Sequence, residues 1–294
     1  MRSLVTLLAL TLPATALAQP ASVERGPWGA LIQGGYVHQF DSDIDGGGSF
    51  SVDRFFVEGG PNYSFDRRTS VGLNVAYGYD GYDFSSDGAG SFTGWDSVNE
   101  VRVGVPVRFG IGERVNAFVA PQLRMTAESG ADFGSGATGG AVAGFSYTFG
   151  ERLSIGPGIG VFSQIEDSVA VFPILLVDWK ITDTLSLETG QGLGATRGPG
   201  LVANWQPIDD WTFGVGARYE SFQFRLADGG VGRERAFPVF FTAGYSPMPL
   251  VSGALVVGAD VGGELTRENG FGQTVEREDF DPAPFVGVTF RGRF

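Results

Sequence analysis

The chain has 294 residues, a formal net charge of −13 and no cysteine. The lack of thiols excludes disulfides and cysteine chemistry, and the acidic balance disfavours nucleic acid as a partner. Glycine (47 residues) and aromatic residues (13%) are abundant, yet mean hydropathy is only +0.06. This composition suits a β protein in lipid, in which every second residue of a strand faces the membrane.

The first 18 residues have the pattern of a secretory signal peptide. Arg2 supplies a positive start, Leu4 to Leu12 form a short apolar run, and Ala16-Leu17-Ala18 resembles a cleavage site before Gln19. The apolar run is too short to cross a bilayer as a helix, which needs about 20 residues. We therefore expect export, with residues 19–27 as a brief periplasmic lead-in to the next segment.

Residues 28–294 are predicted to form one all-β domain, an antiparallel up-and-down transmembrane β-barrel. Short connections, such as Gly112-Glu113-Arg114 and Gly150-Glu151-Arg152, alternate along the chain with longer loops that are rich in Gly, Ser and Asp. Short periplasmic turns and longer extracellular loops are typical of outer-membrane barrels. The predicted strands are 28–40, 52–66, 69–84, 95–110, 115–128, 138–149, 153–165, 169–181, 185–195, 200–208, 211–226, 235–246, 250–266 and 279–294.

This gives about 14 strands, and 12 is the alternative because the strands that flank 196–199 are the weakest. An even number places both termini on the periplasmic side. Within 101–109, valines and Phe109 alternate with Glu100, Arg102 and Arg108, which predicts one face in lipid and one in the lumen.

Aromatic residues beside the short turns predict a periplasmic girdle. Its members are Phe65, Phe109, Phe149, Trp179, Trp205, Trp211, Tyr245 and Phe294. At the other rim, we expect an outer girdle of Phe40, Tyr82, Phe84 and Trp95.

The last strand, Asp279 to Phe294, alternates apolar residues with arginines and ends on an aromatic residue. It resembles the closing strand of Gram-negative outer-membrane β-barrels, which ends in Phe and is read by the barrel-assembly machinery. The resemblance implies that Phe290 and Phe294 act as the assembly signal. Together with Trp211 to Leu226, this strand looks like an outer-membrane barrel family catalogued only as a domain of unknown function. That resemblance implies fold and location but no activity.

The alternation assigns a set of charged residues to the lumen. The candidates are Arg54, Glu58, Glu100, Arg102, Arg108, Arg124, Glu188, Arg218, Glu220, Asp260, Glu264, Arg291 and Arg293. A parity switch is expected near residue 220, with a β-bulge that turns Gln223 and Arg225 inward. The set fits either a hydrated pore that filters solutes by charge or a lumen filled by ion pairs. The first strand offers Gln33 but no acid opposite Arg291 and Arg293, which predicts a local basic wall.

Two further stretches are considered for chemistry. Asp41, Asp43 and Asp45 resemble the first half of a calcium loop, but Val52 stands where the bidentate Glu belongs, so an acidic surface loop is favoured. His38 is the chain's one histidine, and no acid–His–Ser constellation is visible around it. A lipid-modifying enzyme is therefore the third alternative, and no metal or cofactor is expected.

The sequence thus predicts a passive or weakly selective outer-membrane pore for small solutes. A structural barrel with a lumen filled by ion pairs is the runner-up. Outer-membrane lipid and lipopolysaccharide are the expected surroundings, and the barrel-assembly machinery is the expected partner during biogenesis. The sequence does not determine the solute or the oligomeric state.

Overall fold

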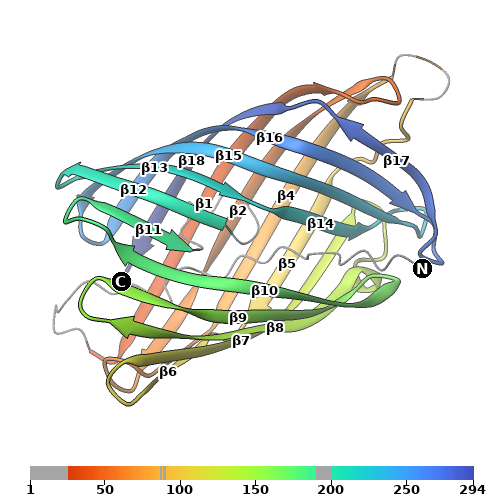
Figure 1. The fold of residues 1–294 in the computed structure, drawn as a ribbon. Helices are drawn as coiled ribbons and strands as arrows, with labels where there is room; N and C mark the ends of the chain where they lie inside the picture. The colour runs from red at the N-terminus through yellow and green to blue at the C-terminus, as the bar shows by residue number, and fades with distance from the viewer. Residues whose placement is uncertain (1–25, 87, 89–90, 190–199) are drawn as a thin grey trace.

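The computed structural model describes residues 26–86, 88, 91–189 and 200–294. The predicted signal peptide and nearly all of the lead-in lie outside these residues and stay predictions. Within the described part, the chain forms a closed antiparallel β-barrel of 14 strands (Figure 1). The predicted fold and strand number are confirmed, and the alternative of 12 strands is wrong.

The barrel is built from 18 strand segments in the described ranges, because some barrel strands are interrupted. The first nine are β1 (Trp28–Asp43), β2 (Ser49–Ser64), β3 (Ser70–Gly72), β4 (Asn74–Ser85), β5 (Val98–Gly104), β6 (Val107–Ile111), β7 (Val115–Glu128), β8 (Ala137–Phe149) and β9 (Leu153–Gln164). The others are β10 (Asp167–Lys180), β11 (Leu185–Thr189), β12 (Gly200–Ile208), β13 (Trp211–Arg218), β14 (Glu220–Arg225), β15 (Val231–Met248), β16 (Val251–Glu268), β17 (Thr274–Phe280) and β18 (Ala283–Arg293). One short 3-10 helix, η2 (Phe133–Gly136), lies between β7 and β8.

Four barrel strands consist of two segments each: β3 with β4, β5 with β6, β13 with β14, and β17 with β18. Each pair lies along the same neighbour; β13 and β14, for example, both pair with β15. Pro106 and Pro282 stand at two of the breaks, where they cannot donate to a ladder. The barrel closes between β1 and β18, in a register that places Gly35 opposite Thr289.

The two ends of the barrel differ. At one end, which we call the turn end, tight turns such as 112–114 and 150–152 join the strands. Gly112 and Gly150 have φ angles of 59° and 61° there, a conformation that glycine adopts without strain. At the other end, the loop end, most connections are longer, as between β4 and β5. In the described part of the chain, no helix is long and apolar enough to cross a membrane.

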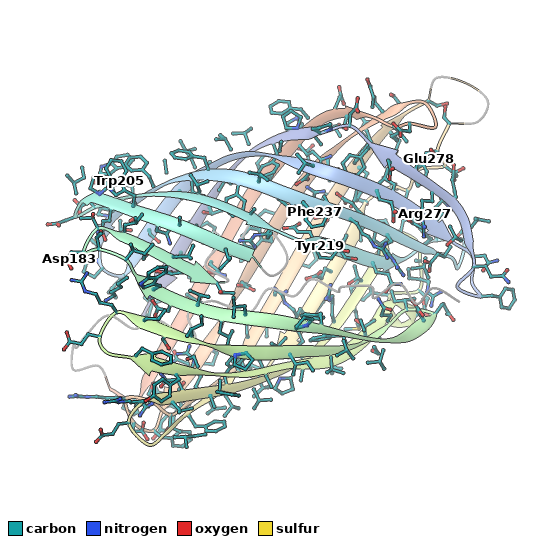
Figure 2. All side chains as sticks on the ribbon, in the orientation of Figure 1. Asp183, Trp205, Tyr219, Phe237, Arg277 and Glu278 are labelled. Atoms are coloured by element: carbon teal, nitrogen blue, oxygen red, sulfur yellow. The ribbon has the colours of Figure 1, made fainter. Side chains whose placement is uncertain are left out.

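The outer surface is apolar, as the alternation predicts. Outward side chains include Val103, Leu123, Val215, Leu255 and Val257, all of which are exposed. All eight aromatic residues of the predicted girdle at the turn end are also exposed. Trp205 is one of them and projects from the barrel beside that end (Figure 2).

The predicted outer girdle is largely wrong. Phe40 is exposed, but Tyr82 and Trp95 are only 8% and 5% exposed, and Phe84 packs against the same internal cluster. Tyr82 and Phe84 share a face of β4 with the buried Ala76 and Asp80, so they point into the lumen. The aromatic side-chain type suggested an interfacial position, whereas the strand's own alternation decides the direction.

Candidate functional site in the barrel lumen

Arg54 is the centre of an ion-pair layer that crosses the lumen. Its guanidinium contacts Glu234 at 2.5 Å, Asp260 at 3.6 Å and Asp80 at 4.0 Å. The three acids come from β4, β15 and β16, and all are buried. Inward alternation on strands that surround the lumen brings these residues together although they are far apart in sequence. The shared arginine compensates carboxylates that would be costly to bury alone.

A second group of charges lies beside this layer on β2, β5 and β7. Arg102 contacts Glu58 at 2.9 Å and Glu100 at 3.9 Å, while Arg124 contacts Glu100 at 3.8 Å. Glu58 also accepts a hydrogen bond from Gln33. These side chains are buried or nearly so, which differs from the hydrated side chains that line a wide pore.

Arginines gather on the lumen side nearer the turn end. Arg291 lies opposite Gln33 and donates to its Oε1 at 2.9 Å, and Arg293 lies opposite Leu31. Arg108 and Arg293 are close enough to repel each other, as are Arg291 and Arg293. The amide of Gln33 thus stands between Arg291 and the carboxylate of Glu58, so the acid reaches this wall from the second strand rather than from the first.

An aromatic cluster occupies the lumen at the loop end. Trp95 packs against Phe224, Tyr82, Phe84 and Phe92, with ring centroids 5.0 to 5.6 Å apart. Other buried members are Ile44, Phe50, Val52, Val98, Phe222, Leu226, Ala236, Leu265, Phe280 and Ala283. We call this set the aromatic cluster; it lies directly beyond the ion-pair layer.

Two smaller apolar clusters cover other parts of the lumen wall. One contains Phe118, Val142, Phe162, Ala170, Phe172 and Leu176 from β7 to β10. The other contains Val37, Val202, Phe240, Val256 and Phe285. Arg218 lies over the Phe240 ring, 5.2 Å from its centroid, which adds a cation–π contact. The described lumen wall therefore carries three apolar clusters, and its charged residues lie at the level of Arg54 and nearer the turn end.

Glycines on the inward face allow these rings to lie flat against the sheet. A side chain at Gly160 would overlap the Phe172 ring, and one at Gly232 would overlap the Phe224 ring. The same relation holds between Gly216 and Phe240. The abundance of glycine is thus tied to aromatic packing inside the barrel, and smooth curvature alone does not account for it.

The structure places most of the predicted lumen residues on the inward face. Glu188 lies opposite Asp178 and accepts a hydrogen bond from Ser186. Glu220 lies opposite Ala236, a member of the aromatic cluster, and therefore points to the loop end of the lumen.

Glu264 is a correction, because it faces away from the lumen. The register between β15 and β16 shifts between Arg235 and Phe237, and Gly262 has a φ angle of 60°. This bulge reverses the faces of β16 beyond it. Leu265 is fully buried in the aromatic cluster, while Glu264 pairs with Arg235 and Arg277 on the opposite face.

The expected parity switch near residue 220 is wrong. Ala217 pairs with Val239 and Glu220 with Ala236, so the register of β13 and β14 against β15 is unchanged. Phe222 and Phe224 therefore continue the lumen face of Arg218. Gln223 and Arg225 lie on the other face, where residues of the β7–β8 and β9–β10 connections cover them.

Sequence reasoning missed Asp80 and Glu234, both partners of Arg54. Asp80 alternates with the outward Tyr77 and Tyr79, so parity could have found it. Glu234 stands between Arg233 and Arg235 in a run of charged residues without alternation. Only the three-dimensional structure reveals its direction.

The same barrel architecture occurs in solved structures. The toluene transporter TbuX from Ralstonia pickettii superposes with a TM-score of 0.55 at 12% identity, over 98% of this chain and 96% of that one. A FadL homologue from Pseudomonas aeruginosa gives 0.50 at 11% identity, over 97% and 94%. An outer membrane channel from Pseudomonas putida F1 gives 0.49 at 10% identity, over 94% and 100%. At these identities the likeness to TbuX and to the FadL homologue shows the fold alone.

No family model and no curated protein matches the sequence. The resemblance to a family of unknown function therefore stays a prediction.

The outer face of β1 and β2 carries the chain's one histidine. His38 Nδ1 lies 2.7 Å from Asp53 Oδ1, and Tyr36 donates a 2.5 Å hydrogen bond to the same oxygen. His38 also packs edge-on against Phe40. An acid–His pair thus exists on the outward surface, which sequence inspection did not reveal. The nearby Ser42 points inward instead and donates to the carbonyl of Asp281.

The three aspartates of the predicted surface loop do not converge. Asp41, Asp43 and Asp45 are exposed, whereas Ser42 and Ile44 between them are buried. β1 continues to Asp43, so the carboxylates alternate along an extended strand rather than around a turn. In the described ranges, no group of three or more His, Cys, Asp or Glu side chains could hold a metal.

Proposed function

We propose that this chain is an outer-membrane channel for small, largely apolar solutes. The observation that carries the proposal is the lining of the lumen. Its wall bears two buried apolar clusters, around Phe172 and around Phe240, in addition to the aromatic cluster at the loop end. An apolar lining favours apolar solutes, because it offers few partners to replace the hydration of an ion.

The outer surface supports the proposed location. Exposed aliphatic residues cover the barrel wall, and exposed aromatic residues ring the turn end, as in a barrel that lies in a bilayer. We place the turn end in the periplasm and the loop end outside the cell. TbuX, which has a similar fold, is described as a toluene transporter, and toluene belongs to the proposed solute class.

A structural barrel without transport is the second candidate. The burial of Glu58, Arg124 and Asp260 in ion pairs favours it, since such pairs hold different strands of the barrel together. The two functions differ in whether solute passes through the barrel, so transport measurements separate them.

The test combines ion conductance with solute uptake. The mature chain is refolded, its folding is verified by heat-modifiable gel mobility, and it is inserted into planar bilayers. In parallel, cells that express the chain are assayed for uptake of a radiolabelled small aromatic hydrocarbon. We expect low ion conductance together with uptake above that of the empty vector. Large steady ion currents would instead establish a hydrated pore, and the absence of both would establish the structural barrel.

A matched pair of variants links uptake to the lumen. Val256 is buried in the lumen cluster around Phe240, and its neighbour Val257 is exposed on the outside. We expect V256Q to lower uptake and V257L to leave it unchanged. Equal uptake in both folded variants would contradict passage along this part of the lumen.

A further inference from the structure

Neighbouring strands on one side of the barrel are interrupted at the same level. The ladder between β13 and β15 ends at Ala217–Val239, and pairing resumes between Glu220 of β14 and Ala236. Pro238 of β15 lies in this gap and cannot donate a hydrogen bond. Tyr219 and Phe237 meet beside it, with ring centroids 4.9 Å apart (Figure 2).

The next two strands continue this line. The bulge at Gly262 in β16 follows Val261, which pairs with Phe237. The break between β17 and β18 falls at Asp281 and Pro282, just beyond the Gly263–Phe280 pair. A bulge or break weakens the ladder and lets a sheet bend. The defects thus form one fold line across the wall, and we call the sheet beyond it the flap.

The flap consists of β14, residues 231–236 of β15, residues 263–268 of β16, and β17. Its strands are joined by continuous ladders apart from one register shift between β16 and β17 at Arg267 and Glu268, so it is a small sheet of its own. Its inner face contributes Phe222, Phe224, Leu265 and Phe280 to the aromatic cluster. Its outer face is polar, with Arg235, Glu264 and Arg277 among its side chains. It therefore places an apolar plug in the loop-end mouth and a polar surface away from it.

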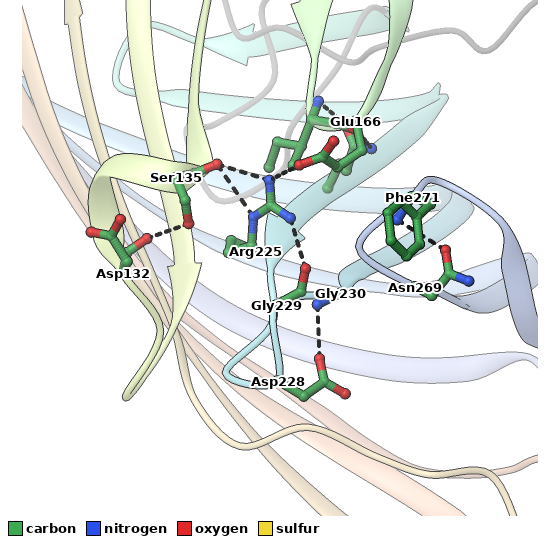
Figure 3. Close-up of polar contacts among 11 residues, drawn as sticks. Asp132, Ser135, Glu166, Arg225, Asp228, Gly229, Gly230, Asn269 and Phe271 are labelled. Carbon is green, nitrogen blue, oxygen red and sulfur yellow. Dashed lines mark hydrogen bonds and ion pairs between the residues drawn. The ribbon is translucent and has the colours of Figure 1, made fainter.

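The edge strand of the flap reaches the opposite wall of the barrel. Arg225 of β14 forms a single parallel bridge with Ala127 of β7. Its Nη2 donates to Glu166 at 2.6 Å and to the Ser135 carbonyl at 3.2 Å (Figure 3). Gln223 exchanges two hydrogen bonds with the backbone of Ile165, at 3.1 and 3.2 Å. These side-chain contacts, which we call the latch, join the flap to the β7–β8 and β9–β10 connections.

We propose that the flap is a gate that swings about the fold line and that Arg225 and Gln223 hold it shut. The inference rests on the proposed function, because a gate regulates passage through the lumen. Opening breaks the latch and leaves the ladders within the flap in place. The movement also separates Glu234 from Arg54 and Tyr82, and Arg267 from the carbonyls of Thr93 and Gly94. It also exposes Phe222 and Phe224, so an apolar solute that covers these rings favours the open state.

A buried reporter tests the movement without relying on transport. Val98 of β5 is 1% exposed within the aromatic cluster. The chain has no cysteine, so V98C introduces a single thiol. The rate at which a water-soluble maleimide labels this thiol is measured in folded V98C and in the folded double variants V98C/R225A and V98C/Q223A. We expect the latch variants to label about tenfold faster or more, because R225A loses a charge-assisted hydrogen bond to Glu166 and Q223A loses two hydrogen bonds to Ile165.

The control variant is R235A in the same V98C background. Arg235 pairs with Glu264 inside the flap, so its removal leaves the latch intact. It is expected to label at the rate of V98C alone. If the latch variants are folded and label no faster than this control, the flap is a fixed part of the wall and the proposal is overturned.

A reversible lock gives the opposite perturbation. Ala127 and Arg225 are partners in the bridge between β7 and β14, and bridged strands about 4.8 Å apart lie within the Cα range of a disulfide. We expect oxidised A127C/R225C to block hydrocarbon uptake and the reduced form to restore or exceed it. Uptake that is equal in both forms would contradict gating. If the latch variants label faster but no variant takes up hydrocarbon, the proposed channel function is overturned. The proposed movement of the flap is then still supported by the labelling.

Discussion

Tyr82 donates a 2.6 Å hydrogen bond from its phenolic oxygen to Glu234, and this bond joins the aromatic cluster to the ion-pair layer. Both side chains are buried, and they come from opposite halves of the sequence. Glu234 also contacts Arg54, so one carboxylate connects the packing of the loop end with the charge balance of the middle. Packing and electrostatics in this lumen are therefore coupled.

The first prediction concerns the central arginine. R54A leaves Asp80, Glu234 and Asp260 buried without their common partner, so we expect it to lower the free energy of unfolding by about 3–5 kcal/mol. Urea unfolding in lipid vesicles, followed by tryptophan fluorescence, measures the change. R152A is the control, because Arg152 and Asp183 form an exposed pair at the turn end, 57% and 92% exposed. That variant is expected to cost at most about 1 kcal/mol, and equal losses in both would contradict the ion-pair layer.

The second prediction concerns glycines beneath aromatic rings. In G160A the new methyl group would overlap the Phe172 ring, which must shift within a packed cluster. We expect a loss of about 1–3 kcal/mol in the free energy of unfolding. G253A serves as the comparison, since the nearest atom there is a carbonyl oxygen at an ordinary 3.5 Å. A G160A protein as stable as G253A would show that the ring is not held against the strand.

The third prediction tests the lipid-facing surface by depth. Val257 and Val251 are both exposed on β16, but Val251 begins the strand at the turn end and Val257 lies further along it. In a bilayer, V257R is expected to cost about 2–4 kcal/mol and V251R about 0–1 kcal/mol. The same urea titration in vesicles measures both variants. Two equally small effects would contradict a membrane around this part of the barrel.

The fourth prediction concerns the basic wall near the turn end. Arg291 and Arg293 repel each other inside the lumen, so this region favours anions among any ions that enter. We expect the double variant R291E/R293E to shift the reversal potential towards cation preference in a salt gradient. R114E/R152E, at two exposed turns, provides a control with the same change of charge. An unchanged reversal potential in the double variant would disprove a role of these arginines in selectivity.

Sequence alternation was a good guide where strands run without interruption. It assigned Arg54 and Glu58 to the lumen, and it assigned the exposed Val103 and Phe109 to the outside. It failed for Glu264 beyond the Gly262 bulge and for Phe222 and Phe224 near the break at Tyr219. One inserted residue in a strand reverses every later side chain, and a single sequence seldom reveals where that happens.

The sequence by itself determined the β-barrel, a strand number of 14 or 12 and the apolar outer face, because a period of two is a local property of each strand. Only the tertiary structure decided which inward residues meet. Arg54 meets Glu234 and Phe224 meets Trp95 inside the 14-stranded barrel, at positions set by register, bulges and the bend of the flap. Such contacts depend on how distant strands are staggered around the barrel, and no local pattern in the chain records that stagger.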